Sequence, residues 1–274
     1  MSTRAVPVER ISFKQIWDSQ DLSGTATPLL RYVAIPAAWP LTWLFLHIGF
    51  HPNVVTTIRF AVAILVLPLI VLPQATYYAI GLISFAIAIV LDQVDGQICR
   101  IKNQASYFGK FYDGLTDAVT EIPLPTLLGL HLWLRDDAVH SLITGFAASA
   151  ALALMYIVLL RYGLISQWVK GSVPNAPASH HPRLRRVLDR PFMKGVSSFV
   201  NVRMIVVLND VRYCGLIVAV VTDQLAPYLL LFFVLHCMAI AALVPLRLLD
   251  AYDRYDIHRY SHSAANQRAS REAI

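Results

Sequence analysis

The chain has 274 residues, of which 57% are hydrophobic and 15% are charged. Soluble domains usually carry about a quarter charged residues, so this composition argues against a soluble enzyme and favours a lipid-embedded protein. The net charge of +6 does not indicate nucleic-acid binding, because the basic residues gather between and beside apolar segments, as in membrane proteins with a positive-inside topology.

The first 50 residues are predicted to lie at the membrane surface. Residues 8–22 mix apolar with charged side chains, and residues 29–50 are apolar but carry Pro36 and Pro40. We interpret both segments as interfacial or half-inserted helices that form an N-terminal region, residues 1–50. A seventh spanning helix is the alternative, and it would move the N-terminus to the opposite side of the membrane.

Six apolar stretches follow, each close to the roughly 20 residues that a membrane-spanning helix needs. They are predicted at residues 54–73, 76–98, 118–134, 138–160, 202–221 and 227–249. The predicted fold class is therefore all-α, a polytopic membrane protein. Its six-helix transmembrane domain covers residues 51–250, and a polar tail covers residues 251–274.

The connections between these spans differ in charge. The turns around Gln74 and Gln224 contain no Lys or Arg, and the turn at Asp136 contains only Arg135. The loops on the opposite side of the membrane carry both Lys and Arg, and the C-terminal tail is rich in Arg. The positive-inside rule then places both termini and the basic loops in the cytoplasm, which agrees with an even number of spans.

The most informative stretch, residues 91–117, reads LDQVDGQICRIKNQASYFGKFYDGLTD. Residues at intervals of three and four share one face of a helix. Two such stripes occur here, and they comprise Asp92, Asp95, Gly96, Cys99, Arg100, Gly109, Asp113 and Asp117. Because a polar turn at residues 102–106 joins the two halves, the sequence predicts a helical hairpin that brings four carboxylates together.

Four ionised carboxylates beside a bilayer repel one another and are costly to bury. Either some of them are protonated, or divalent cations neutralise them. An all-oxygen ligand set favours Mg²⁺, Mn²⁺ or Ca²⁺ over zinc, and two such ions about 4 Å apart can hold a pyrophosphate during an in-line displacement. A solvated acidic helix face is the alternative interpretation.

The same residues resemble the signature of the CDP-alcohol phosphotransferase family, D-x2-D-G-x2-A-R-x8-G-x3-D-x3-D. Every fixed position matches at the right spacing except one, where Cys99 stands in place of the family's Ala. The resemblance implies a core of six transmembrane helices, usually dimeric, whose site opens to the cytoplasm. It also implies transfer of a phosphate-linked group from a CDP-activated donor, with release of CMP.

The resemblance further implies roles for single residues. Two divalent cations, Mg²⁺ or Mn²⁺, would be bound by Asp92, Asp95, Asp113 and Asp117. Asp117 would also be the base that activates the acceptor hydroxyl. The CDP part of the donor would be held by Gly96, Arg100 and Gly109.

Residues 51–60, HPNVVTTIRF, resemble the P-N-x-x-T segment at the start of the family's first core helix. This resemblance makes Asn53 and Thr56 candidates for contact with the donor, whereas helix capping is the alternative role for both. Arg59 lies within an apolar span, where a charge normally faces a polar cavity, so we place it near the donor phosphates.

The acceptor must be inferred from charges in the fourth and fifth spans. Arg161 ends the fourth, and Arg212 interrupts the fifth. In relatives that use inositol phosphate, arginines on these helices bind the acceptor's phosphate, and PLLRY in the N-terminal region also resembles that branch. A structural ion pair between Asp210 and Arg212 is the alternative.

Three functions remain open at this point. The first is a phospholipid synthase that joins CDP-diacylglycerol to a soluble alcohol, such as inositol phosphate or glycerol phosphate. The second uses a soluble CDP-amino alcohol, such as CDP-choline, with diacylglycerol as the acceptor. The third is a non-catalytic membrane relative that retains the metal-binding hairpin.

Overall fold

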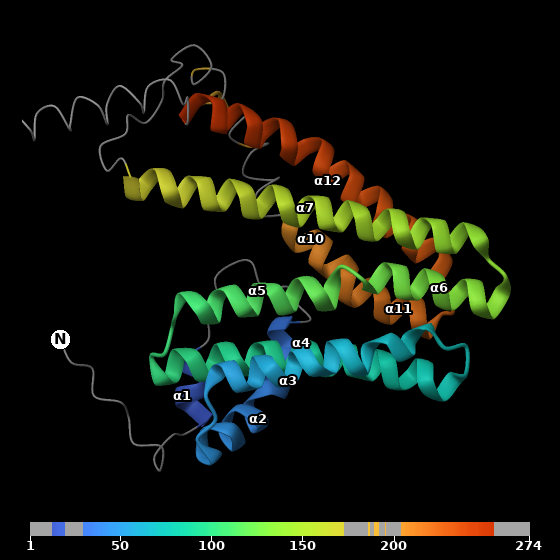
Figure 1. The fold of residues 1–274 in the computed structure, drawn as a ribbon, viewed down its shortest axis with the longest axis horizontal. Helices are drawn as coiled ribbons and strands as arrows, with labels where there is room; N and C mark the ends of the chain where they lie inside the picture. Colours follow the sequence, from blue (N-terminus) through green and yellow to red (C-terminus); the bar gives the residue numbers. More distant parts are fainter. Residues whose placement is uncertain are drawn as a thin grey trace, which may run out of the picture. The chain divides into compact units, whose positions relative to one another are not determined.

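A computed structural model describes residues 13–19, 30–172, 186, 189–191, 195 and 204–254. In this part of the chain the regular elements are all helices, which confirms the all-α fold class. Figure 1 shows helices α3 (Pro52–Leu65), α4 (Ala75–Lys102) and α5 (Tyr107–Glu121) lying alongside one another.

The chain divides into two compact units. The first comprises Met1–Ala153 and Ile205–His236, and the second comprises Leu154–Met204 and Cys237–Ile274. Helices α7 (Val139–Ser172) and α12 (Leu225–Arg254) each contribute to both units. The predicted hairpin belongs wholly to the first unit, and the predicted tail beyond Arg254 lies outside the described residues.

Contacts between α7 and α12 hold the second unit together. The Arg247 guanidinium lies 4.2 Å from the centre of the Tyr162 ring, a cation–π contact. The Tyr162 hydroxyl donates a hydrogen bond to the Asp250 carboxylate. These two contacts join polar side chains of α7 to polar side chains of α12.

Helix α3 begins beside a proline. The His51 ring accepts a hydrogen bond from the backbone N–H of Asn53 at 3.2 Å and so caps the helix. Pro52 takes the first helical position, where its missing N–H removes no hydrogen bond. The alternative interpretation of Asn53 or Thr56 as the cap is therefore wrong, because a residue upstream of both performs that role.

The polar turn between α4 and α5 folds as predicted. Helix α4 ends at Lys102, and Asn103 takes a left-handed conformation (φ 51°), which ends many helices. The Ser106 side chain then accepts a hydrogen bond from the N–H of Gly109 at 2.9 Å and caps α5. The helical hairpin is thereby confirmed.

Three of the predicted spans are interrupted. The first passes from α3 into a 3-10 helix, Leu67–Val71. The third falls across a break at Ile122 and Pro123, which separates α5 from α6 (Leu124–Asp136), because proline cannot donate within a helix. The fifth is divided into α10 (Met204–Asp210), a π-helical turn and α11 (Leu216–Val221). The π-helical turn, Val211–Gly215, contains Arg212.

Four stretches of the described chain are long and apolar enough to cross a membrane. They are Pro52–Val71, Ala75–Lys102, Val139–Ser166 and Leu225–Tyr252. These stretches correspond to the first, second, fourth and sixth predicted spans. The chain is thus a membrane protein, whereas the total of six spans remains a prediction.

The N-terminal region packs against the hairpin. Helix α1 (Phe13–Asp18) contributes Ile16, and α2 (Ile35–Ile48) contributes Ala38 and Leu46. These side chains share one buried cluster with Val55, Leu91, Val94 and Ile98. Helix α2 continues a π-helical turn, Leu30–Ala34, and this stretch is not among the four that are long and apolar enough to cross a membrane in the described chain, which fits the interfacial or half-inserted interpretation.

The turn between α6 and α7 is neutralised by ion pairs. Its arginine, Arg135, lies 2.7 Å from a carboxylate oxygen of Asp136 and 2.8 Å from one of Asp223. A hydrogen bond from this guanidinium lowers the pKa of the Asp136 carboxyl below its ordinary value. The turn therefore gains no net positive charge from Arg135.

Helices α6 and α7 approach closely through two glycines. A Cβ atom added to Gly145 would lie 2.5 Å from the carbonyl oxygen of Pro125 and 3.1 Å from the Cα of Gly129. Small residues at such contacts let membrane helices pack backbone against backbone. Since both obstructing atoms are backbone, we expect Gly145→Ala to destabilise the protein by about 1–3 kcal/mol.

The measurement is the thermal unfolding midpoint in detergent. Gly163→Ala is the matched control on the same helix, because a Cβ there meets nothing within 4 Å. We expect Gly163→Ala to be neutral or stabilising, since alanine favours helices over glycine. Equal midpoints for the two variants would show that the α6–α7 contact is not tight.

Candidate active site

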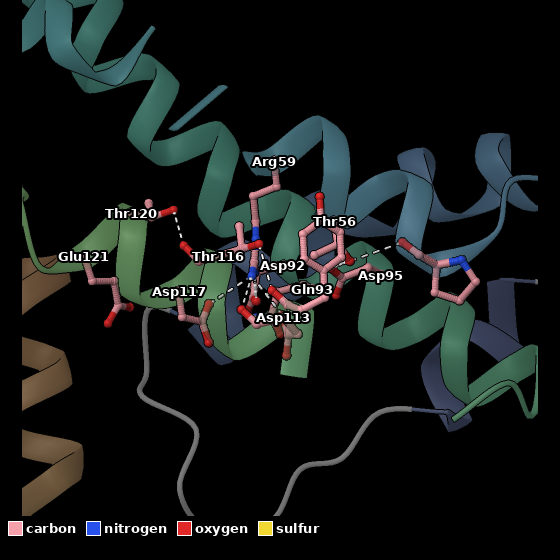
Figure 2. Close-up of polar contacts among 12 residues, drawn as sticks. Thr56, Arg59, Asp92, Gln93, Asp95, Asp113, Thr116, Asp117, Thr120 and Glu121 are labelled. Atoms are coloured by element: carbon pink, nitrogen blue, oxygen red, sulfur yellow. Dashed lines mark hydrogen bonds and ion pairs between the residues drawn. The ribbon is translucent and has the colours of Figure 1, made fainter. Parts of the chain in front are cut away.

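Helices α4 and α5 direct four aspartates toward one another, as Figure 2 shows. One carboxylate oxygen from each of Asp92, Asp95 and Asp113 lies within 4.8 Å of the other two. Asp95 is buried, with 6% of its surface exposed, whereas Asp92 and Asp113 are partly exposed. Asp117 lies one helical turn beyond Asp113 on α5 and is joined to the group through a shared arginine.

That arginine is Arg59 of α3, which is almost completely buried. Its guanidinium forms an ion pair with Asp92 and lies 2.8 Å from a carboxylate oxygen of Asp113. It also lies 3.0 Å from a carboxylate oxygen of Asp117 and donates to the backbone carbonyl of Asp113 at 3.1 Å. One cation from α3 therefore contacts three of the four aspartates, and Figure 2 shows these contacts as dashed lines.

Neutral side chains bind the carboxylates as well. The Thr56 hydroxyl donates to Asp95 at 2.8 Å, and the Gln93 amide donates to Asp92 at 2.8 Å. Thr56 and Arg59 are three residues apart on α3, so they face the hairpin from one side of that helix. Helix α3 thus completes a polar site that α4 and α5 begin.

A cavity of about 620 Å³ opens beside the aspartates. It is lined by Pro52, Asn53, Thr56, Asp95, Gly96, Cys99, Gln104, Ala105, Ser106, Tyr107, Gly109, Lys110 and Asp113. A Cβ on Gly109 would lie 3.0 Å from the Ser106 hydroxyl and 3.2 Å from the Asn53 amide oxygen. Glycine at this position therefore keeps the wall between α3 and α5 open to a ligand.

A second, smaller cavity of about 40 Å³ lies on the other side of Arg59. Its polar lining includes Asp92, Asp117 and Glu121. Glu121 is one turn beyond Asp117 on α5, and its carboxylate forms a buried ion pair with Arg212. It also accepts a hydrogen bond from the Tyr213 hydroxyl at 2.7 Å. Asp117 therefore stands between the acidic group and a second polar network.

Residues 49–224 match the model of the CDP-alcohol phosphatidyltransferase family. The chain belongs to this family. The match includes α3, both helices of the hairpin and Arg212. Members transfer a phosphate-linked group from a CDP-alcohol and use divalent metal ions. No individual curated protein matches the chain.

The chemistry of the aspartate group fits the metal ions that this family of phosphatidyltransferases uses. Three carboxylate oxygens lie close enough together to bind one ion. Carboxylate oxygens are the ligands that Mg²⁺ and Mn²⁺ prefer. The buried carboxylate of Asp95, whose charge is costly in isolation, would be offset by such an ion.

The predicted donor-binding residues do not all line the larger cavity. Asn53, Thr56, Gly96 and Gly109 line the larger cavity. Arg100 is not among the lining residues; its Nε instead donates to the backbone carbonyl of Ser19 at 2.6 Å. Arg59 contacts the aspartates rather than the larger cavity. The donor-binding roles of all these residues remain predictions.

The two predicted acceptor-binding arginines belong to different units. Arg212 is in the first unit and is buried, whereas Arg161 is exposed in the second. Their joint binding of a phosphate therefore remains a prediction. For Arg212 the alternative interpretation named Asp210 as the ion-pair partner, and the structure provides Glu121.

Glu121 is a charged residue beside the aspartates that sequence reasoning missed. A usable signal was present, because Glu121 continues the stripe of Asp113 and Asp117 at the same interval of four. It lies just outside the family signature and at the start of an apolar stretch. A carboxylate there should have been treated as a functional candidate.

Proposed function

We propose that the chain transfers a phosphatidyl group from CDP-diacylglycerol to an alcohol, releasing CMP, as a step of phospholipid biosynthesis. The observation that carries this proposal is the convergence of Asp92, Asp95 and Asp113 within 4.8 Å beside a cavity of about 620 Å³. A volume between about 300 and 1,000 Å³ is typical of small-molecule sites. The carboxylates beside this cavity would repel a pyrophosphate unless divalent cations neutralised them.

The nucleotide part of the donor is assigned to this cavity. Gly96 and Gly109 allow close approach to the backbone, and Asn53 and Thr56 offer hydrogen bonds from α3. Lys110 supplies a positive charge at the cavity wall. Arg100 lies outside the cavity lining and donates to Ser19, but its planar fork of donors suits a phosphate.

An exposed aromatic surface supports a lipid-linked donor. Tyr107, which lines the cavity, is 98% exposed, and Phe108 and Phe111 on the same helix are also exposed. Aromatic side chains are enriched at the membrane–water interface. Acyl chains joined to the diphosphate could therefore enter the bilayer directly beside the nucleotide.

The proposed reaction is an in-line displacement at phosphorus. The acceptor hydroxyl attacks the phosphorus distal to cytidine, a new oxygen–phosphorus bond forms, and the bond to the bridging oxygen breaks so that CMP leaves. Asp117 accepts the hydroxyl proton. Asp92, Asp95, Asp113 and Asp117 would hold two divalent cations, Mg²⁺ or Mn²⁺, which offset the charge of the diphosphate and of the leaving CMP.

We also propose the orientation of the enzyme in the membrane and its oligomeric state. The site and both termini face the cytoplasm, as the charge bias of the loops indicates. The chain forms a homodimer, as its family resemblance implies.

The donor is tested by measuring CMP release from the purified protein in lipid nanodiscs with Mg²⁺ or Mn²⁺. We expect release from CDP-diacylglycerol when a suitable alcohol is added. Release from CDP-choline with diacylglycerol as the acceptor would instead show the amino-alcohol reaction. Metal binding without release from any CDP donor would favour the non-catalytic relative.

The acceptor is proposed to carry a phosphate that contacts Arg212, and Arg161, which belongs to the other unit, is proposed separately as an acceptor-binding residue. In the ligand-free chain the Arg212 guanidinium is bound to Glu121, so an incoming phosphate must share it with that carboxylate. Removing Arg212 alone would leave the buried Glu121 carboxylate without its cationic partner. The informative variant therefore changes both partners, Glu121→Gln with Arg212→Gln, which keeps the net charge unchanged.

We expect this double variant to raise the KM for glycerol phosphate or inositol phosphate at least about tenfold, the loss expected for one charge-assisted hydrogen bond. The KM for unphosphorylated glycerol or inositol should change much less. Arg161→Gln should act in the same direction. An equal change for phosphorylated and unphosphorylated acceptors would remove Arg212 from phosphate binding.

A further inference from the structure

We propose that Arg59 is an internal counter-ion, which occupies the metal-binding carboxylates until a divalent cation displaces it. This inference rests on the metal site of the proposed function. It adds that the ligand-free site is already filled by a cation of the chain itself. Metal binding is then an exchange of one cation for another rather than the filling of an empty acidic group.

The contacts of Arg59 carry this inference. Its two terminal nitrogens reach Asp92, Asp113 and Asp117, from both helices of the hairpin, and its side chain is only 2% exposed. Two of these residues, Asp92 and Asp113, also belong to the three carboxylates that converge within 4.8 Å. The guanidinium and a metal ion would therefore compete for the same ligands.

Both carboxylate oxygens of Asp92 already accept a hydrogen bond. One of them accepts from Arg59, and the other accepts from the Gln93 amide. A small cation such as Mg²⁺ demands close, well-directed oxygen ligands at about 2.0–2.1 Å. Each oxygen keeps a second lone pair for a metal, but the positive guanidinium beside Asp92 opposes the approach of another cation.

Electrostatics explain why a built-in cation is useful. Carboxylates placed together in a poorly solvated site repel one another, and an unpaired buried charge is strongly destabilising. The guanidinium offsets part of this charge and joins α3 to both α4 and α5. Arg59 therefore keeps the hairpin assembled when no metal is bound.

Two features allow the guanidinium to give way. Asp95 is held by the Thr56 hydroxyl, and it lines the larger cavity, so a cation can reach one ligand from that cavity first. The Nε of Arg59 is buried and makes no hydrogen bond within the described residues, so only the terminal nitrogens hold the group in place. Once displaced, the guanidinium stays tethered to α3 beside the site.

The test measures Mn²⁺ binding by electron paramagnetic resonance and thermal unfolding of the metal-free protein. The main variant is Arg59→Gln, purified with Mg²⁺ and then treated with a chelator. Arg59→Lys retains the charge but lacks the planar fork that bridges several carboxylates. Arg135→Gln is the matched control, because Arg135 also bridges two aspartates, Asp136 and Asp223, at a distant turn.

We expect Arg59→Gln to lower the unfolding midpoint of the metal-free protein and to tighten Mn²⁺ binding at least about tenfold, since a competing positive charge within a few ångströms has been removed. Its midpoint should recover when Mn²⁺ is added. Arg59→Lys should lie between this variant and the natural chain. Arg135→Gln should leave Mn²⁺ affinity unchanged.

Several results would overturn the inference. Unchanged or weaker Mn²⁺ binding by both Arg59 variants would mean that Arg59 supports the site rather than competing for it. Equal loss of stability with and without Mn²⁺ would mean a purely structural ion pair. If neither the natural chain nor Arg59→Gln bound Mn²⁺, the metal site itself would fail, and CMP release would then have to be metal-independent.

Discussion

Asp117→Asn is expected to lower the rate of CMP release by about 100-fold to 10,000-fold, the usual contribution of a general base. Asp117 lines the smaller cavity and contacts Arg59, so it lies between the acidic group and the Glu121 network. An asparagine of similar shape cannot accept the hydroxyl proton. The measurement is CMP release in nanodiscs at saturating donor and acceptor.

The folded state of this variant must be checked separately, by its unfolding midpoint and elution profile. Asp223→Asn is a suitable control, because it removes a carboxylate that binds Arg135, in a different part of the first unit. We expect the control to keep its turnover. Turnover of Asp117→Asn at the rate of the natural chain would remove Asp117 from the role of base.

Asp95→Asn is expected to abolish both Mn²⁺ binding and CMP release. Asp95 is the most buried of the four aspartates. It is one of the three converging carboxylates, and it lines the larger cavity. Loss of even an outer partner of a metal ligand typically costs about 10- to 100-fold in affinity. Loss of a charged ligand should therefore weaken Mn²⁺ binding by more than about 100-fold.

Thr56→Val separates the charge of Asp95 from its orientation. This variant keeps the carboxylate but removes the hydroxyl that donates to it at 2.8 Å. We expect about a 10- to 100-fold loss of Mn²⁺ affinity, smaller than that of Asp95→Asn. Metal-free Asp95→Asn should be no less stable than the natural chain, since one of several crowded negative charges is gone. Full Mn²⁺ binding by Asp95→Asn would exclude Asp95 as a ligand.

The sequence predicted the hairpin well because its determinants are local. Helical periodicity puts Asp92 and Asp95 on one face and Asp113 and Asp117 on another. The turn between them carries its own stop and start signals, Asn103 in the left-handed conformation and Ser106 as a cap. Nothing distant along the chain is needed to form either helix.

The partners of these aspartates could not be predicted in the same way. Arg59 reaches Asp113 across 54 positions, and Arg212 reaches Glu121 across 91. Hydropathy identified both arginines as unusual within apolar spans, but it did not say which carboxylate each one meets. Pairing of this kind depends on how the helices pack, and no local spacing encodes that.

The interrupted spans show a second limit. A window of apolar residues covers both sides of Pro123 evenly, although the proline ends the hydrogen-bonded helix there. The π-helical turn at Val211–Gly215 is likewise invisible to average hydropathy, yet it contains the buried Arg212. Such turns within helices occur frequently at functional sites. Average hydropathy found the apolar segments but not the backbone changes that position the polar groups.

The central claim is that the α4–α5 hairpin holds divalent cations beside the donor's diphosphate. The most direct measurement is an experimental structure of the natural chain with Mn²⁺ and a CDP donor, with Mn²⁺ located by its anomalous scattering. Manganese peaks are expected among Asp92, Asp95 and Asp113, next to a diphosphate in the larger cavity. A diphosphate bound elsewhere, with those three side chains turned away from any ion, would contradict it.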